Sequence, residues 1–420
     1  MKFSVLSSLL LSVSSLVLSS PIDMKKRTNR RWDYNGDNLY GVNLGGWFVL
    51  EPYVTPSLFN QFGSDIPVDE YHYCEYLGEA EASRRLTQHW SSWYVENDFA
   101  QMPQYGLNMV RIPIGYWAFK KLDSDPYVQG QEAYLDQALA WCKKYGLKAW
   151  IDLHGAPGSQ NGFDNSGLRD TYEWQAVDGN VQLTLDVLDY ISSKYSAEDY
   201  VDTVIGIELL NEPLGPILDQ TQLTNFYNNG YQTVRKYGDV PVIFHDAFFQ
   251  TPGYWDNVLN NQFDSSVWDT VIDHHHYQVF STGELQRDIT AHVAASCQWG
   301  KDSAYEYHWA INGEWSAALT DCATWLNGVG RGSRYENQYD SSAYIGSCDS
   351  VLSGDIDVPT YRKYVESQLD AFTYGDKNKG WVFWCYKTEN AVEWDFTKLV
   401  TLNVIPQPFT DRWYPNQCGY

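Results

Sequence analysis

The sequence VIGIELLNEP, residues 204–213, combines two features that recur along the chain. Its first part, Val204–Leu210, is a short and nearly continuous apolar run, which is typical of a parallel strand covered on both faces. The run then stops at polar residues, Asn211 and Glu212, and at Pro213. Eight candidate strands of this kind follow one another: Tyr40–Leu44, Met109–Ile114, Lys148–Leu153, Val204–Leu210, Val240–His245, Val271–His276, Trp309–Asn312 and Trp381–Trp384.

The segments between these strands have the apolar spacing of amphipathic helices. They include Glu132–Lys144, Val181–Lys194, Leu223–Tyr237 and Tyr361–Phe372. Eight strand–helix units in one domain predict an α/β fold, a (β/α)₈ TIM barrel, in preference to a doubly wound sheet. We expect long loops at Phe59–Glu81 and Cys322–Val358, at the carboxyl face where barrel active sites are built.

The first 27 residues have the pattern of a targeting and processing segment. Residues 1–20 predict a secretory signal peptide, and residues 21–27 a propeptide ending at Lys26-Arg27, which leaves a single barrel domain over 28–420. We expect the product to be secreted and monomeric. The formal net charge of −24 disfavours nucleic acid and anionic membrane surfaces as partners.

Charged and polar side chains gather where the candidate strands end. Glu212 follows the fourth strand, and Glu314 follows the seventh in the run Asn312-Gly313-Glu314-Trp315. Hydrolysis of a glycoside needs two carboxyls, one protonated for the leaving oxygen and one ionised. We expect the fourth and seventh strands to lie on opposite sides of the ring, so that the two carboxyls face each other. Their separation, which decides between retention and inversion, stays open.

A run of three histidines, His274–His276, is a weak metal signal. Neighbouring strand residues point to opposite faces, so either His275 alone or the two residues beside it can face the barrel interior. The seven cysteines contain no C-x-x-C motif. We therefore expect no metal and no cofactor.

Several motifs in combination resemble the fungal exo-1,3-β-glucanases of glycoside hydrolase family 5, in clan A. The likeness extends from about residue 32 to the C-terminus. The motifs are GVNLGGW (41–47), LEP (50–52), LHGAPGSQNG (153–162), LNEP (210–213), HHYQVF (275–280), GEWS (313–316), and Trp384 with KTEN (387–390). The pair Cys385-Tyr386, which follows Trp384, departs from the pattern of this family.

The resemblance implies retaining hydrolysis of terminal, non-reducing β-D-glucose from 1,3-β-glucans in cell-wall glucan metabolism. Glu212 would be the acid/base and Glu314 the nucleophile. A covalent intermediate can also be trapped by another sugar, so transglucosylation is compatible with this mechanism. The product would be extracellular or associated with the cell wall.

The resemblance also implies a set of substrate-binding residues. Arg111 and Tyr277 would hold the nucleophile, Glu51 would grip the terminal glucose, and Phe163 with Phe280 would form an aromatic clamp. The full set is Glu51, Tyr53, Arg111, His154, Phe163, Asp164, Asn165, Asn211, His275, Tyr277, Phe280, Asn327, Arg331 and Trp384.

Four cysteines lie in polar, loop-like sequence and are the candidates for disulfides: Cys297, Cys322, Cys348 and Cys418. The resemblance implies the pairs Cys297–Cys418 and Cys322–Cys348. Cys142 and Cys385 lie in apolar patterns and are expected to be buried thiols, and Cys74 is left open.

Two other functions are compatible with the sequence. The same frame could carry a family 5 endo-β-glucanase or a β-glucosidase for a glycolipid. A non-catalytic protein that binds wall glucan is disfavoured because both Glu212 and Glu314 are present.

Overall fold

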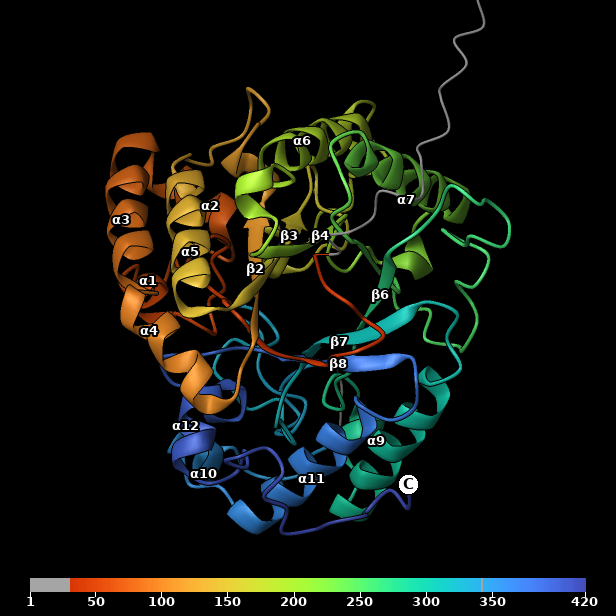
Figure 1. Cartoon of the computed structure of the whole chain (residues 1–420). Helices are drawn as coiled ribbons and strands as arrows, with labels where there is room; N and C mark the ends of the chain where they lie inside the picture. Colours follow the sequence, from red (N-terminus) through yellow and green to blue (C-terminus); the bar gives the residue numbers. More distant parts are fainter. Residues whose placement is uncertain (1–30, 341–342) are drawn as a thin grey trace, which may run out of the picture. The chain divides into compact units, whose positions relative to one another are not determined.

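The computed structural model describes residues 31–340 and 343–420, so the predicted signal peptide and propeptide lie outside the described residues. Eight parallel strands close into a barrel in the order β1 to β8 (Figure 1). The strands are β1 Leu39–Asn43, β2 Met109–Gly115, β3 Lys148–Gly155, β4 Val204–Glu208, β5 Val242–His245, β6 Thr270–His275, β7 Trp309–Trp315 and β8 Asn378–Phe383. The predicted (β/α)₈ fold is therefore confirmed, and each predicted strand is present with its ends moved by a few residues.

Helices surround the barrel (Figure 1). They are α1 Pro56–Asn60, α2 Glu70–Leu77, α3 Glu79–Ser92, α4 Glu96–Gln101, α5 Gln131–Tyr145, α6 Asn180–Tyr195, α7 Gln220–Arg235, α8 Thr282–Leu285, α9 Ile289–Ser303, α10 Asp349–Leu352, α11 Val358–Ala371 and α12 Phe396–Thr401. Short 3₁₀ turns are η2 Met102–Tyr105, η3 Tyr116–Ala118, η4 Asp164–Ser166, η5 Glu198–Tyr200, η6 Gly215–Ile217 and η7 Val392–Trp394. Within the described ranges, no helix is both long and apolar enough to cross a membrane.

The predicted long loop Phe59–Glu81 is wrong, because most of this segment is helical. It contains the end of α1, all of α2 and the start of α3. The carboxylate of Asp69 caps α2 by accepting a hydrogen bond from the backbone N–H of His72. Only Glu70, Tyr73 and Cys74 of α2 are buried, so the apolar spacing that identifies a helix is weak here.

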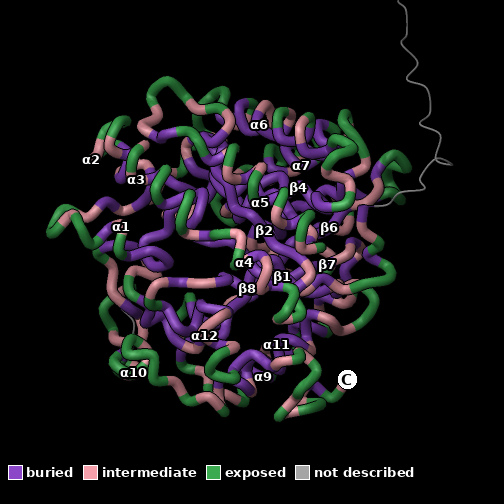
Figure 2. Tube along the Cα trace, turned by 60° about the vertical axis from the view of Figure 1, so that its left-hand side comes forward, coloured by how far each residue is buried: buried purple, intermediate pink, exposed green. Residues whose placement is uncertain are grey.

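The interior of the barrel changes character along its axis. Near the amino ends of the strands, apolar side chains such as Met109, Trp150, Ile243 and Val271 fill it completely. Side chains two residues further along a strand point to the same face. Those positions hold Arg111, Asp152, His245 and Asp273, all fully buried. The tube in Figure 2 shows buried backbone along the strands and exposed backbone mainly at the periphery. The polar end of this packed interior is where a site can form.

Both disulfides implied by the resemblance are present, Cys297–Cys418 and Cys322–Cys348. The expected loop environment is wrong for Cys297, which lies within α9 and is buried against Val293. The other cysteines of the described chain, Cys74, Cys142 and Cys385, are free and buried. The C-terminal segment is thus tied covalently to the helical layer.

Replacing Cys297 and Cys418 together with Ser is expected to lower the free energy of unfolding by about 2–4 kcal/mol. The bridge spans 121 residues, and its removal frees a long loop in the unfolded chain. Thermal unfolding followed by circular dichroism measures the effect. The control is the parent protein with both bridges intact, and an unchanged melting temperature would contradict a stabilising role.

Candidate active site

Glu212 and Glu314 come together at the carboxyl end of the barrel. Glu212 follows β4, Glu314 lies in β7, and His275 at the end of β6 lies between them. Nδ1 of His275 is 2.7 Å from Oε1 of Glu212 and 3.4 Å from Oε2 of Glu314. These two oxygens are therefore no more than about 6 Å apart, which fits the roughly 5–5.5 Å of retaining enzymes better than the roughly 6.5–9.5 Å of inverting ones.

In the closed ring of eight strands, β4 and β7 lie three positions apart, one short of diametrically opposite, so the expectation that their ends face each other across the mouth broadly holds. In the closed strand order, only β5 and β6 separate β4 from β7 on one side. His275, at the end of β6 between them, has a side chain that reaches both carboxyls.

Arg111 is the cation beneath the site and is completely buried. Its guanidinium contacts Glu314 at 3.0 Å, Glu208 at 2.8 Å, Asp152 at 3.2 Å and Asp273 at 3.6 Å. Burial raises the pKa of Asp152 to about 7 and that of Glu208 well above its usual range, although Arg111 opposes both shifts. One guanidinium thus neutralises several carboxyls only in part, and the raised pKa values of Asp152 and Glu208 favour their protonated forms.

A chain of hydrogen bonds fixes the amide of Asn211. Its Oδ1 accepts a bond from Nη2 of Arg111 at 2.7 Å, and its Nδ2 lies 3.4 Å from Nε2 of His154. Nδ1 of His154 lies 2.6 Å from Asp152, and burial lowers the pKa of His154 well below its usual range. A neutral His154 that donates to Asp152 can accept from Asn211, so the orientation of this amide is determined.

Glu212 is held at the backbone and at both carboxylate oxygens. Its backbone is left-handed, with φ 44°, and its carbonyl accepts a hydrogen bond from Nδ2 of Asn161 at 3.2 Å. Nδ2 of Asn165 donates to Oε2 at 3.0 Å, while His275 contacts Oε1. Non-glycine residues in this region of backbone space are strained and cluster at functional sites.

The electrostatics of the two glutamates differ. Burial, with help from the negative charge of Glu212, raises the pKa of Glu314 to about 8, against the opposing effects of His275 and Arg111. Burial also acts to raise the pKa of Glu212, but the hydrogen bond and charge of His275 prevail and lower it to about 2. Tyr277 donates its hydroxyl to Oε2 of Glu314 at 2.8 Å. Glu212, His275 and Glu314 together therefore retain protons at neutral pH. One of these protons lies in the contact between His275 and Glu212.

One wall of the site consists of Trp384, Tyr53 and Glu51. The indole N–H of Trp384 donates to the Tyr53 hydroxyl at 2.5 Å, and its ring stacks on His154 with centroids 5.5 Å apart. Glu51 is buried, and burial together with the charges of Asp164 and Glu314 raises its pKa well above its usual range. A protonated Glu51 can both donate and accept hydrogen bonds.

The unexpected pair Cys385-Tyr386 lies behind this wall and not on its surface. Both side chains are buried, and the peptide between Trp384 and Cys385 is cis. A Cβ on Gly45 would lie 3.1 Å from both Trp384 and Cys385, so the GVNLGGW motif supplies a glycine where the indole packs. Trp384 itself stacks on His154 and bonds Tyr53.

The two clamp phenylalanines lie at the surface. Phe163 is 38% and Phe280 is 43% exposed. Phe163 meets Phe248 edge to face, with centroids 6.3 Å apart, and Phe280 meets Tyr277 in the same way at 5.4 Å. Next to Phe163, Asp164 is buried, and burial raises its pKa to about 7.

Asn327 and Arg331 lie in the loop after β7, where their contacts are to loops and not to the glutamates. Nδ2 of Asn327 donates to Asp321 at 2.9 Å and to the carbonyl of Gly332 at 3.0 Å. Arg331 pairs with Asp170, in the loop after β3, at 2.6 Å. Asn327 thus stabilises the loop after β7 internally, and Arg331 connects this loop to the loop after β3.

The site also contains residues that the sequence did not single out. Asp273 accepts a hydrogen bond from the backbone N–H of Gly313 at 2.7 Å, next to Glu314. Asn43 accepts from Arg111 at 3.0 Å, and Glu208 and His245 complete the set. The available signal was a charged or polar residue inside an apolar strand run, two positions from an interior apolar side chain.

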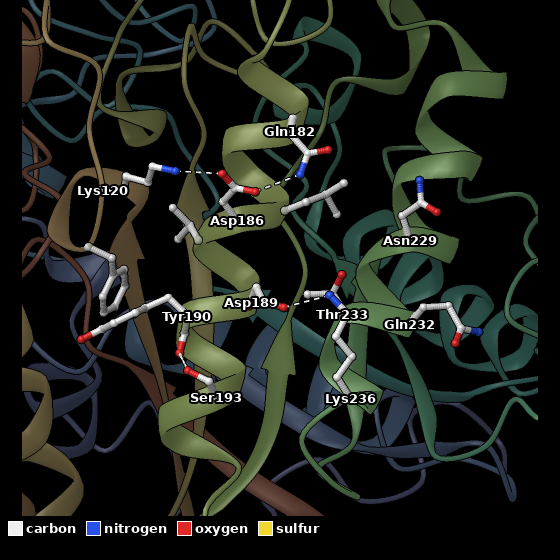
Figure 3. A pocket seen from close by; sticks show the side chains of 13 residues that line it. Lys120, Gln182, Asp186, Asp189, Tyr190, Ser193, Asn229, Gln232, Thr233 and Lys236 are labelled. Carbon is white, nitrogen blue, oxygen red and sulfur yellow. Dashed lines mark hydrogen bonds and ion pairs between the residues drawn. The ribbon is translucent and has the colours of Figure 1, made fainter. Parts of the chain in front are cut away.

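A surface groove of about 800 Å³ lies elsewhere, on α6, α7 and Lys120 (Figure 3). Lys120 pairs with Asp186 at 2.8 Å and Lys236 pairs with Asp189 at 2.9 Å. None of the site residues described above lines this groove. The chemistry is therefore assigned to the barrel end and not to this groove.

A (β/α)₈ barrel with two carboxyls this close at its carboxyl end has the architecture of a glycoside hydrolase. The family model for cellulase (glycosyl hydrolase family 5) matches residues 74–328, which include both Glu212 and Glu314. The chain belongs to glycosyl hydrolase family 5.

Full-length relatives extend the match to Glu51 and Trp384. A glucan 1,3-beta-glucosidase of Pichia angusta is 57% identical over 426 residues, covering 100% of this chain and 97% of the relative. Glucan 1,3-beta-glucosidase 2 of Wickerhamomyces anomalus is 56% identical, covering 97% of this chain and 98% of the relative. The crystal structure of rutinosidase from Aspergillus niger has a TM-score of 0.68 at 18% identity, covering 89% of this chain and 99% of that chain, and at this identity the likeness shows the fold alone.

Proposed function

We propose that this protein is a retaining, exo-acting glucan 1,3-β-glucosidase that releases terminal glucose from the non-reducing end of 1,3-β-glucans. The observation that carries the mechanism is the contact of His275 with both Glu212 and Glu314, which limits the separation of the two carboxyls to about 6 Å. The substrate is inferred from the full-length relatives, which are named glucan 1,3-beta-glucosidases.

In the first step, Glu212 gives its proton to the glycosidic oxygen and the bond from that oxygen to C1 breaks. A carboxylate oxygen of Glu314 bonds to C1, which gives a covalent glucosyl ester. Arg111 and Tyr277 each hold one oxygen of Glu314, so the attacking group cannot rotate away. In the second step, water attacks C1, its proton returns to Glu212, and the ester oxygen leaves with the bonding electrons.

The contact between His275 and Glu212 supplies the proton of the first step. The two atoms are 2.7 Å apart, so a proton can pass from Nδ1 to Oε1 with little movement of either side chain. The strong fixed donors, Arg111 and Tyr277, lie on Glu314. Arg111 and Tyr277 favour the ionised form of Glu314, yet in the free site burial raises the pKa of Glu314 to about 8 while the pKa of Glu212 is about 2. The mechanism therefore requires a proton to move from Glu314 to Glu212 before attack, and Nδ1 of His275 lies 3.4 Å from the first and 2.7 Å from the second.

The wall residues fit the terminal sugar of a chain. Trp384 would stack on the glucose ring, Glu51 and Tyr53 would bond its hydroxyls, and Asn211 would bond its 2-hydroxyl. Phe163 and Phe280, both partly exposed, would clamp the next sugar at the entrance. The remaining residues of the set line the pocket or its rim: His154, Asp164, Asn165, Asn327 and Arg331.

We further propose that the protein acts outside the cell or in the cell wall, as a monomer, after removal of residues 1–20 and 21–27. Two disulfides support this, since such bridges persist in oxidising compartments.

Product analysis on laminarin tests the proposed function. We expect glucose as the only early product, released with β configuration by NMR, because retention requires two inversions at C1. Boiled enzyme is the control for uncatalysed release. Oligosaccharides as first products would favour an endo-glucanase, and α-glucose as first anomer would contradict the double displacement.

A further inference from the structure

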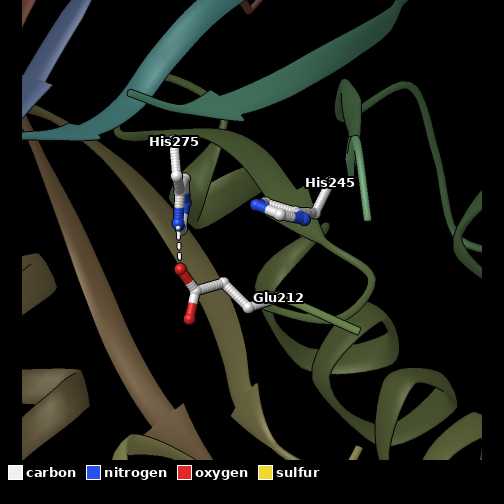
Figure 4. A group of neighbouring side chains, drawn as sticks. All are labelled: Glu212, His245 and His275. Atoms are coloured by element: carbon white, nitrogen blue, oxygen red, sulfur yellow. Dashed lines mark hydrogen bonds and ion pairs between the residues drawn. The ribbon is translucent and has the colours of Figure 1, made fainter. Parts of the chain in front are cut away.

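His245 is a fully buried histidine at the end of β5, beside the contact between His275 and Glu212 (Figure 4). The rings of His245 and His275 are 4.3 Å apart between centroids, with an interplanar angle of 76°. One nitrogen or oxygen atom from each of Glu212, His245 and His275 lies within 4.8 Å of the others. His245 is completely buried, and Glu212 and His275 are the neighbours on which we consider it to act.

The backbone determines which nitrogen of His245 carries the proton. The N–H of Ala247 donates to Nδ1 of His245 at 2.9 Å, so Nδ1 presents a lone pair. Burial lowers the pKa of His245 to about 4, so the ring is neutral and its single proton lies on Nε2. Within residues 31–340 and 343–420, Nε2 has no hydrogen-bond partner.

The loop after β5 is built to hold this arrangement. Ala247 and Phe248 are consecutive left-handed residues, with φ 52° and 64°, a strained conformation that only surrounding contacts can maintain. Asp246 provides them, since its Oδ1 accepts from the N–H of Phe248 at 2.8 Å and its Oδ2 lies 2.7 Å from Nδ1 of His274. The indole N–H of Trp255 donates to the carbonyl of Asp246 at 2.7 Å.

Figure 4 shows the His245 ring pointing at the face of His275, with a nitrogen leading. An N–H edge against an aromatic face is favourable, since the edge is positive and the face of a neutral ring is negative. The same edge is unfavourable against an imidazolium. Burial acts to lower the pKa of His275, but the charges of Glu314 and Asp273 prevail and raise it well above its usual range. The N–H edge of His245 opposes this charged form and shifts the balance toward a proton on Glu212.

The alternative is a metal site, because one carboxylate and two imidazoles can bind Zn²⁺. A metal would need the lone pair of Nε2, which requires moving the proton of His245 to Nδ1. That proton would then face the N–H of Ala247, donor against donor. The hydrogen bond from Ala247 favours the donor role.

We propose that His245 is a positioning residue, whose neutral N–H edge orients His275 and shifts the shared proton onto Glu212. This inference rests on the proposed function, in which Glu212 is the acid. Other ionisable groups also affect the protonation of His275 and Glu212, and a substitution at His245 leaves these groups in place. The carboxyls and cation beneath it are Asp152, Glu208, Asp273, Glu314 and Arg111. Those around the sides are Glu51, His154, Asp246 and Tyr277.

The test is His245→Asn, in which Oδ1 can still accept from Ala247 while the Nε2 edge is lost. We expect kcat on laminarin to fall about tenfold, part of the roughly 10²–10⁴-fold that a general acid contributes. On 2,4-dinitrophenyl β-glucoside, whose leaving group needs no proton, the first step should be nearly unchanged. The basic limb of kcat/KM against pH should move to higher pH, because His275 then holds its proton more strongly.

A second variant, His245→Gln, can bring an amide N–H close to the position of Nε2 and should recover part of the loss. His308→Asn is the matched control, a buried histidine at the other end of the barrel that bonds Thr270 and the carbonyl of Val258. It should lower the melting temperature without changing the ratio of the two substrates.

Equal losses on both substrates in His245→Asn, without a shift of the basic limb, would make the role purely structural and overturn the proposal. Inhibition by added Zn²⁺ in the parent and not in His245→Asn would assign the group to a metal and overturn it as well. Glu212→Gln distinguishes a failure of the His245 proposal from a failure of the proposed acid role of Glu212. If kcat/KM of that variant falls equally on both substrates, the acid assignment of Glu212 fails, whatever His245 does; kcat does not decide this, because Glu212 is also the base of the second step.

Discussion

Glu314→Gln is expected to lower kcat on laminarin by on the order of 10⁴–10⁶-fold, as loss of a nucleophile does in other covalent enzymes. The amide has the same shape, and its oxygen can still accept from Arg111 or Tyr277, so the fold should persist. It carries no charge and cannot form the glucosyl ester. Steady-state kinetics on laminarin and on 4-nitrophenyl β-glucoside, with circular dichroism to verify folding, measure the loss.

Azide distinguishes the roles of the two glutamates. With an activated aryl glucoside, Glu314→Ala with azide should give α-glucosyl azide, because azide replaces the nucleophile on that face. Glu212→Ala should give the β-azide, because azide attacks the glucosyl ester from the other face. Exchange of the two products would reverse the assignment. Glu198→Gln, at an exposed position in the helical layer, is the control and should act like the parent.

The strands could be predicted because each is a nearly continuous apolar run with a polar stop. Val204–Leu210 is of this kind: β4 ends at Glu208, but Leu209 and Asn211 still bond the backbone of Ile243 and Leu153. The segment of α2 could not be predicted in the same way. It buries an acid, Glu70, whose partners Leu50 and Trp117 are distant in the chain.

The sequence singled out the glutamates and some of their neighbours, but not the acids beneath them. Glu212, Glu314 and His275 lie at or just after the ends of strands, Arg111 lies within β2, and the structure brings these side chains together. The acids around Arg111 follow from the closed ring. Glu208 lies in an apolar run, and only the pairing of strands shows that it faces Arg111. The short distance between the two glutamates is known only from the structure, which gives the order of the strands and the contacts of His275 with both carboxyls.

Arg111→Met is expected to lower the free energy of unfolding by about 3–5 kcal/mol and to abolish activity. Methionine fills much of the space but leaves four carboxyls, Asp152, Glu208, Asp273 and Glu314, without their cation. Burial already raises the pKa values of Asp152 and Glu208, and Arg111 opposes both shifts. Its removal should raise them further.

This change also predicts the pH dependence of stability. A carboxyl whose pKa is higher in the folded than in the unfolded state binds more protons when folded, so stability falls as pH rises. The loss of melting temperature in Arg111→Met should thus be larger at pH 8 than at pH 5. Arg362→Met is the matched control, since Arg362 is fully buried but pairs with one buried carboxylate, Glu366. It should show a smaller difference between the two pH values, and an equal loss at both values in Arg111→Met would mean that these carboxyls do not depend on Arg111 for their charge.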